Sequence, residues 1–140
     1  MKRIPIGVIL ATLSVPASAT TSLGGAGIVP EESPPNVVIF FTDDQGYGDL
    51  SCFGHPTIHT PHLDRMAAEG VKLTQFYVAS PVCSPSRAAL MTGCYPKRVG
   101  MHRHVIFPTY DYGLHPEEVT IADVLAGAGY ATGCFGKWHL

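Results

Sequence analysis

The junction that decides the fold reads N-V-V-I-F-F-T at positions 36–42 and D-D-Q-G-Y-G-D at positions 43–49. Residues 37–42 are a continuous apolar run of mostly β-branched and aromatic residues, which is typical of a strand buried on both faces of a parallel sheet. Residues 43–49 are a polar, glycine-rich turn that stops the strand abruptly. The junction therefore predicts an α/β fold in which order begins at Asn36 and the first strand, 37–42, ends in an acidic loop.

Helix and strand patterns alternate downstream of this junction. A Thr-Pro start and a glycine stop predict a helix over 60–70, and a Ser-Pro start predicts another over 84–93. A capping box predicts a third over 120–128. Residues 71–78 and 130–139 read as further strands, so the alternation predicts a mostly parallel sheet flanked by helices.

Composition excludes several classes of protein. The 46% of hydrophobic residues and 14% of charged residues are incompatible with intrinsic disorder or a coiled coil. A chain of 140 residues supports one core. The 9 basic residues nearly balance the 11 acidic ones, so no basic face for nucleic acid is predicted.

The N-terminus carries a pattern typical of export. Two basic residues precede an uncharged, mostly apolar stretch at 4–15, and a small-x-small pattern ends at Ala19. We therefore predict a signal peptide over 1–19, cleaved near Ala19. The apolar stretch is shorter than the roughly 20 residues of a membrane span. Residues 20–35 are rich in Gly, Pro and Ser and predict a flexible lead-in to the folded part, 36–140. The expected compartment is periplasmic, extracellular or lysosomal.

Export leaves the state of the cysteines open, because disulfides persist outside the cytosol. If all are structural, two bridges in three connectivities are available. If one is chemically special, at least one other has no partner. The cysteines are Cys52, Cys83, Cys94 and Cys134.

Asp43 and Asp44 form a candidate cation site. Their side chains can share one ion only if the backbone turns just past the strand, which Gly46 and Gly48 permit. Oxygen ligands suit Ca²⁺ or Mg²⁺. An ordinary acidic loop is the alternative.

Cys83 and Arg87 form a candidate anion site. A helix that starts with Pro85 at its first position would leave Cys83 just outside its N-terminus, where free N–H groups favour anions. Arg87 could reach back toward the same anion with a bidentate fork. A structural cysteine beside a helix cap, with a surface arginine, is the alternative.

Lys137 and His139 would share one face of a strand end, with Trp138 packed on the other. A solvated lysine and a satisfied histidine are the alternative. Ligands of open parallel sheets bind at the carboxyl ends of strands, where all three candidate sites are expected. Their combination predicts hydrolysis of an anionic ester.

These motifs resemble the type I sulfatases of the alkaline phosphatase superfamily, and the arylsulfatase A-like members most closely. Residues 83–87 match the C-x-P-S-R signature, which extends to Gly93. Residues 129–139 resemble the second signature of the family, and 43–49 resemble its metal-binding opening. The resemblance covers Pro35 to Leu140 and implies the opening portion of the family's helix-flanked, mostly parallel sheet.

The resemblance also implies a reaction. A formylglycine-generating enzyme would oxidise Cys83 to formylglycine, whose hydrate attacks the sulfur of a small-molecule or glycan sulfate ester. A covalent sulfate ester of residue 83 then forms, and its breakdown releases sulfate and restores the aldehyde. Ca²⁺, with Mg²⁺ as the less favoured ion, would be held by Asp43, Asp44 and the oxygen of modified residue 83.

The remaining residues receive roles from the same resemblance. Arg87 would hold the hydrate, Lys137 would contact the sulfate, and His139 would hydrogen-bond the hydrate. The family supplies further metal ligands and catalytic groups after its K-W-H element. We therefore expect residues 36–140 to be the N-terminal part of a truncated catalytic domain, inactive on its own. Phe135 and Cys94 depart from the usual residues of the two signatures.

Several alternatives stay open. The same C-x-P-S-R motif occurs in phosphonate and phosphodiester hydrolases of the superfamily, and a non-catalytic exported module is a third possibility. His102 and His104 lie in an aromatic-rich stretch that either lines the substrate pocket or forms a surface loop. Three further histidines, interrupted by prolines, favour a loop over a zinc site: His55, His59 and His62.

Overall fold

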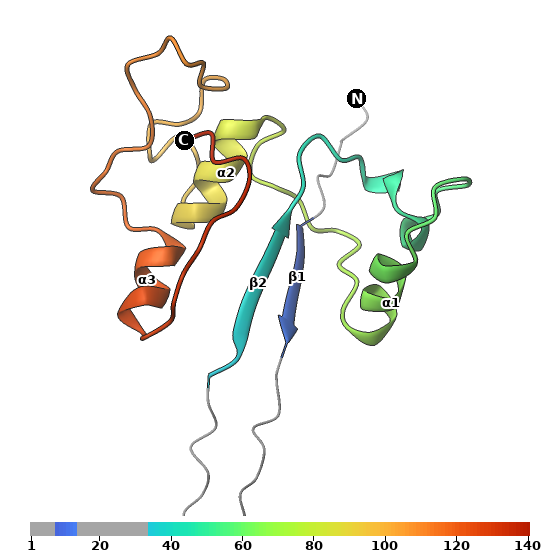
Figure 1. Ribbon diagram of the computed structural model, residues 1–140. Coiled ribbons are helices and arrows are strands. Elements are labelled where there is room, and N and C mark those ends of the chain that lie inside the picture. Colours follow the sequence, from blue (N-terminus) through green and yellow to red (C-terminus); the bar gives the residue numbers. More distant parts are fainter. Residues whose placement is uncertain (1–7, 14–33) are drawn as a thin grey trace, which may run out of the picture.

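The computed structural model describes the backbone of residues 8–13 and the whole of residues 34–140 (Figure 1). Helices lie on either side of a single two-stranded sheet among these residues (Figure 1). In chain order the elements are β1 (Val8–Leu13), β2 (Asn36–Phe41), the short 3₁₀ turns η1 (Tyr47–Asp49) and η2 (Ser51–Phe53), α1 (Pro61–Glu69), α2 (Cys83–Thr92) and α3 (Ile121–Gly127).

The predicted first strand is confirmed as β2, but its neighbour was not predicted. β1 pairs antiparallel with it, in a register that joins Val8 to Phe41 and Leu13 to Asn36. We had expected residues 1–19 to lie outside the fold. An apolar segment at this edge satisfies backbone N–H and C=O groups that would otherwise stay unpaired. Cleavage near Ala19 remains a prediction. The rest of 1–19, and 20–33 of the predicted lead-in, lie outside the described residues.

The two further predicted strands are wrong for this structure. Residues 71–78 and 130–139 form neither helix nor strand. The second segment nevertheless runs beside β2 and in the same direction (red in Figure 1), across a hollow lined by Val37, Ile39, Leu125 and Tyr130. A strand is defined by its hydrogen-bonded neighbour. Neither segment has one among the described residues.

Local sequence signals placed α1 and α3 well. Thr60 and Pro61 open α1, and the N–H of Gly70 closes it on the Met66 carbonyl. At α3 the predicted capping box is present: Thr120 Oγ1 accepts from the Asp123 N–H, and the Asp123 carboxylate accepts from the Thr120 N–H. The helix ends at Gly127, one residue before the predicted end.

The start of α2 differs from the prediction. The helix begins at Cys83, with Val82 as its N-cap, so Cys83 is in the first turn and not outside it. Pro85 is the third helical residue. The first N–H groups of any helix lack an intrahelical partner, so a proline there removes no hydrogen bond. Gly93 ends the helix with φ of +67°.

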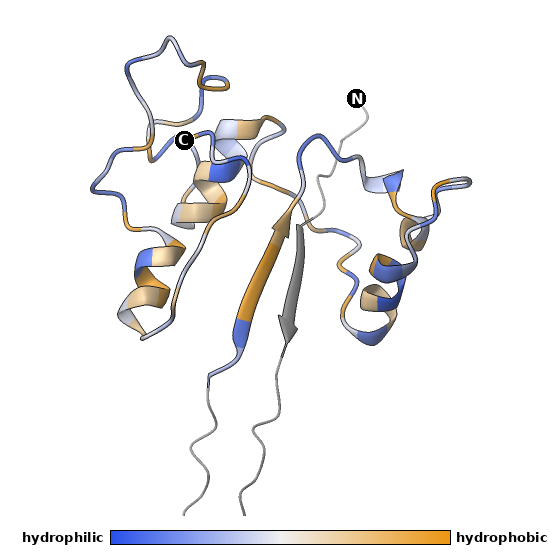
Figure 2. Cartoon of the chain, in the orientation of Figure 1, coloured by the Kyte–Doolittle hydropathy of each residue, from blue (hydrophilic) through white to orange (hydrophobic). Residues whose placement is uncertain are grey.

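The core is small and centred on α2. Ala88 packs with Val99 and Met101, and all three are buried. Partly buried side chains surround them, among them Ile106 and Leu140. Elsewhere apolar side chains stay exposed, among them Val37, Val38 and Phe40 of β2, which is coloured as hydrophobic over most of its length in Figure 2. The first turns of α2 are therefore the most buried part of the described chain.

Candidate active site

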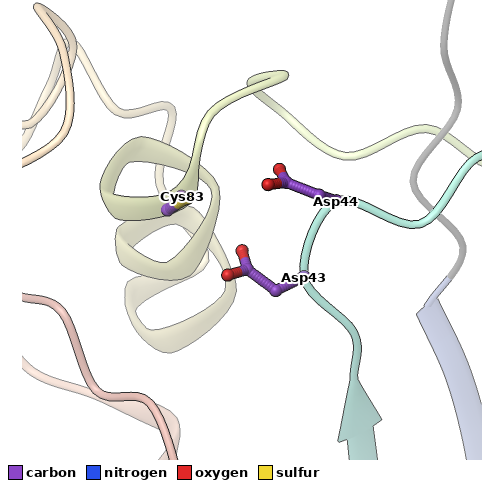
Figure 3. A group of neighbouring side chains, drawn as sticks. All are labelled: Asp43, Asp44 and Cys83. Carbon is purple, nitrogen blue, oxygen red and sulfur yellow. The ribbon is translucent and has the colours of Figure 1, made fainter.

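The end of β2 delivers two carboxylates to the start of α2. Thr42 separates the last residue of β2, Phe41, from Asp43 and Asp44. Both aspartate side chains point toward Cys83 (Figure 3). One potential ligand atom from each of the three residues lies within 4.8 Å of the others. Asp44 adopts φ of +53°, a left-handed conformation that Asp tolerates better than most residues. The turn that we expected the following glycines to permit is therefore made at Asp44 itself.

Arg87 joins the Asp43 carboxylate to the backbone at Lys137. Its side chain is only 11% exposed, and its Nη2 lies 3.6 Å from Asp43 Oδ1. Its Nη1 donates to the Lys137 carbonyl at 2.9 Å. The guanidinium also lies 5.4 Å from the centre of the Phe41 ring, within the range of a cation–π contact. The alternative of a surface arginine is therefore wrong, and Phe41 is a site residue that the strand pattern did not identify.

Lys137 completes the ion-pair network. Its Nζ lies 2.5 Å from Asp43 Oδ2, so each carboxylate oxygen of Asp43 faces one cation. The hydrogen bond from Lys137 lowers the pKa of Asp43, with smaller contributions from Cys83 and Arg87. The same bond raises the pKa of Lys137. Both groups are thereby held in their charged forms.

His139 lies next to this network and has different partners. Its Nε2 is 2.7 Å from the Ile106 carbonyl, and the Ile106 N–H donates to Ser84 Oγ at 3.0 Å. Its Nδ1 is buried and has no hydrogen-bond partner among the described residues. The backbone at His139 has φ of +61°. Among the described residues, the two with positive φ other than glycine are Asp44 and His139, and both belong to the predicted site, where backbone strain is often concentrated.

The other candidate histidines lie apart from this network. His102 and His104 are exposed, and His104 Nε2 contacts the Tyr110 hydroxyl at 3.0 Å. His55 Nδ1 accepts backbone N–H groups of its own loop, as expected for a loop histidine. Within the described residues, the acidic pair and Cys83 are the one group with metal-ligand spacing. All four cysteines are described and free, so no disulfide joins them.

Two carboxylates, a helix-start thiol and two cations thus gather at the end of a strand. Comparisons with known proteins identify the family of the chain. The family model named Sulfatase matches residues 35–140. Human arylsulfatase A is 57% identical over 107 residues, which cover 76% of this chain and 21% of that protein. Mouse steryl-sulfatase is 53% identical over 116 residues, covering 79% and 19%.

A solved structure shows the same relationship in three dimensions. This structure was reported in connection with the metabolism of multiple glycosaminoglycans by Bacteroides thetaiotaomicron. It matches the structure of this chain with a TM-score of 0.62 and a sequence identity of 47%. The match covers 70% of this chain and 20% of that one. The chain therefore belongs to the sulfatase family and shares its fold over this region. It spans about a fifth of the length of the relatives that it matches. No helix of the described residues has the length and apolarity needed to cross a membrane.

Proposed function

We propose that this chain forms part of an exported hydrolase of sulfate monoesters, with aryl or carbohydrate sulfates as substrates. The observation that carries the proposal is the meeting of Cys83 with the two carboxylates that follow β2, one of which, Asp43, also faces Arg87 and Lys137. The names of the relatives, arylsulfatase A and steryl-sulfatase, support the substrate class. In this proposal residues 36–140 are the N-terminal part of an alkaline phosphatase-like catalytic domain.

The donor set fits a hard cation once residue 83 is oxidised. Oxygen ligands lie about 2.3–2.6 Å from Ca²⁺, so two of them on one ion are at most about 5 Å apart. The ligand atoms of Asp43, Asp44 and Cys83 meet this limit at 4.8 Å. A thiol is a poor calcium ligand, whereas the oxygen of formylglycine is a suitable one. We therefore assign Ca²⁺ to these three residues.

The modified residue 83, as its hydrate, supplies the nucleophilic oxygen of the reaction. The start of α2 places it where free backbone N–H groups and the helix dipole favour negative charge. Arg87, fixed by Asp43 and by the Lys137 carbonyl, would hold the hydrate in one orientation. These contacts hold the guanidinium in place before a substrate arrives, which lowers the reorganisation needed during reaction.

Lys137 and His139 would act on the substrate side. The Lys137 side chain is 42% exposed, and its ammonium group would leave Asp43 to bind an oxygen of the substrate sulfate. His139 is oriented by the Ile106 carbonyl through Nε2, which leaves the unpartnered Nδ1 as the atom that would hydrogen-bond the hydrate. A buried ring nitrogen without a partner is costly, and such a bond would remove that cost.

Mass spectrometry of the native full-length protein tests the proposal. The tryptic peptide Leu73 to Arg87 should be lighter by the exchange of H₂S for one oxygen, because Cys83 is converted to formylglycine. The same protein should hydrolyse an aryl sulfate faster than a phosphonate monoester. The opposite preference would indicate a phosphonate hydrolase. If Cys83 keeps its thiol and the protein hydrolyses neither ester, the proposal fails and the alternative of a non-catalytic exported module is supported.

A further inference from the structure

We propose that the aromatic side chains of residues 104–112 form a stacking platform for the ring that carries the sulfate group. This inference rests on the proposed function and specifies its substrates as ring-bearing sulfate esters. The segment projects beyond α2 as the orange loop of Figure 1.

The platform is a continuous set of ring contacts. Tyr110 and Tyr112 are stacked, with ring centres 5.3 Å apart and planes at 16°. Phe107 meets Tyr110 edge to face at 5.6 Å, and His104 does so at 5.3 Å. The Tyr110 hydroxyl also contacts His104 Nε2 at 3.0 Å. Tyr110 is therefore held on several sides, and it in turn orients Tyr112.

Tyr112 presents the open face. Its ring has one ring partner among the described residues, Tyr110, and the residue is 45% exposed. Tyr110 thus covers one face of the ring, and nearly half of the residue stays accessible to a further stacking partner. Aromatic rings stack with offset geometry, and the apolar face of a pyranose ring offers a similar flat surface. The chemistry that this face recognises is a flat, weakly polar ring.

The main chain of Ile106 attaches the platform to the site. Its N–H bonds to Ser84, the residue after Cys83, and its carbonyl bonds to His139. Ser84 is completely buried, so this attachment lies in the most enclosed part of α2. Phe107, the first aromatic residue after this anchor, already belongs to the platform. The platform therefore begins one residue after backbone atoms that contact Ser84 and His139, two residues in or beside the candidate active site.

The test uses the full-length protein and the variants Tyr112→Ala and Tyr112→Phe, with Tyr95→Ala as the matched control. Tyr95 is also exposed, at 74%, and lies in the turn after α2 without an aromatic contact in the described chain. The substrates are phenyl sulfate and a monosaccharide 6-sulfate. Inorganic sulfate serves as a ringless inhibitor that reports on the sulfate site alone.

We expect Tyr112→Ala to raise the KM of at least one substrate about tenfold, equivalent to about 1.4 kcal/mol. The kcat and the inhibition constant of inorganic sulfate should stay unchanged, and Tyr112→Phe should restore the KM. The substrate that responds identifies the ring as aryl or sugar. Unchanged KM values for both substrates in Tyr112→Ala would overturn the platform and leave the proposed function intact. If the wild-type protein hydrolyses neither sulfate, the proposed function fails and the platform fails with it. Should Tyr112→Ala not fold, Tyr112→Leu, which keeps the bulk without the ring, replaces it.

Discussion

Lys137 Nζ lies 2.5 Å from Asp43 Oδ2, although 94 positions separate the two residues in the chain. Arg87 faces the other oxygen of the same carboxylate at 3.6 Å. One side chain at the end of β2 thus connects α2 to the segment that follows α3. Because this connection uses charge and not only apolar contact, its contribution to stability depends on pH.

The Asp43–Lys137 pair should contribute a constant stability between about pH 4 and pH 10. The pKa of Asp43 lies below its ordinary 3.8, so its contribution is complete above that pH and is lost as the pH falls through the lowered pKa. The pKa of Lys137 lies above its ordinary 10.5, so its contribution is lost only as the pH rises through the raised pKa. Urea unfolding of the wild type and Lys137→Met across this range measures the difference.

The expected difference at neutral pH is about 0.2–1 kcal/mol, because both side chains are more than one-third exposed and solvent screens them. It should shrink at pH 2 and at pH 12. A difference that varied between pH 5 and pH 9 would show that another group, and not this pair, controls the effect.

Arg87→Met should lower the free energy of unfolding by about 3 kcal/mol. The variant leaves the Lys137 carbonyl without its donor and removes one of the two cations that face Asp43, in a place where the arginine side chain is almost buried. Arg87→Lys should fall between the wild type and Arg87→Met, because it keeps the charge and loses the planar fork. Urea unfolding measures all three.

Arg65→Met is the control for this series. Arg65 is 70% exposed and pairs with Glu69 at 3.9 Å within α1. Its removal should cost less than about 0.5 kcal/mol. If Arg65→Met and Arg87→Met destabilised the chain equally, the contacts of Arg87 would carry no special weight.

Asp44→Asn should weaken Ca²⁺ binding to the full-length protein at least tenfold, and Asp43→Asn should do so as well. Each replacement keeps the shape of the side chain and removes one of the charges that face residue 83. Isothermal titration calorimetry gives the dissociation constants. Asp111→Asn, an exposed carboxylate outside the group, should bind Ca²⁺ as the wild type does. Equal binding by all four proteins would place the ion elsewhere.

Thr120→Ala should destabilise the chain by about 1 kcal/mol, because it removes the hydroxyl with which Thr120 caps the N-terminus of α3. The N–H of Asp123 would lose its acceptor, Thr120 Oγ1. Thr120→Ser keeps the hydroxyl and should retain most of the stability in urea unfolding. A loss as large in Thr120→Ser as in Thr120→Ala would point to the packing of the methyl group instead.

Two features that depend on neighbours in the sequence were predicted correctly, although the start of α2 was not. Thr120 and Asp123 satisfy each other within a single turn, and Gly70 ends α1 with a bond to Met66. Both signals lie within five consecutive residues, so they depend little on distant parts of the chain. The roles of the candidate site residues, whose types are visible in the motifs, stay predictions.

Features that depend on distant partners were not predictable. Residues 71–78 and 130–139 have strand composition, but a strand also needs a neighbour at the right distance, which composition does not encode. β1 was missed for the converse reason: its apolar residues have a second explanation as a signal peptide. The left-handed backbone at Asp44 and at His139 follows from contacts that only the folded chain makes.

Two hydrogen bonds that fasten residues 101–112 to Ser84 and His139 use the backbone of Ile106, while the side chains of Met101 and Ile106 pack in the core. Proline at position 106 would lack the N–H that Ser84 receives. Residues 107–112 can therefore change without removing these contacts. This makes the segment a natural place for divergence among relatives and for grafting: a donor loop of another sequence should dock in the same position, while a proline at position 106 should release it.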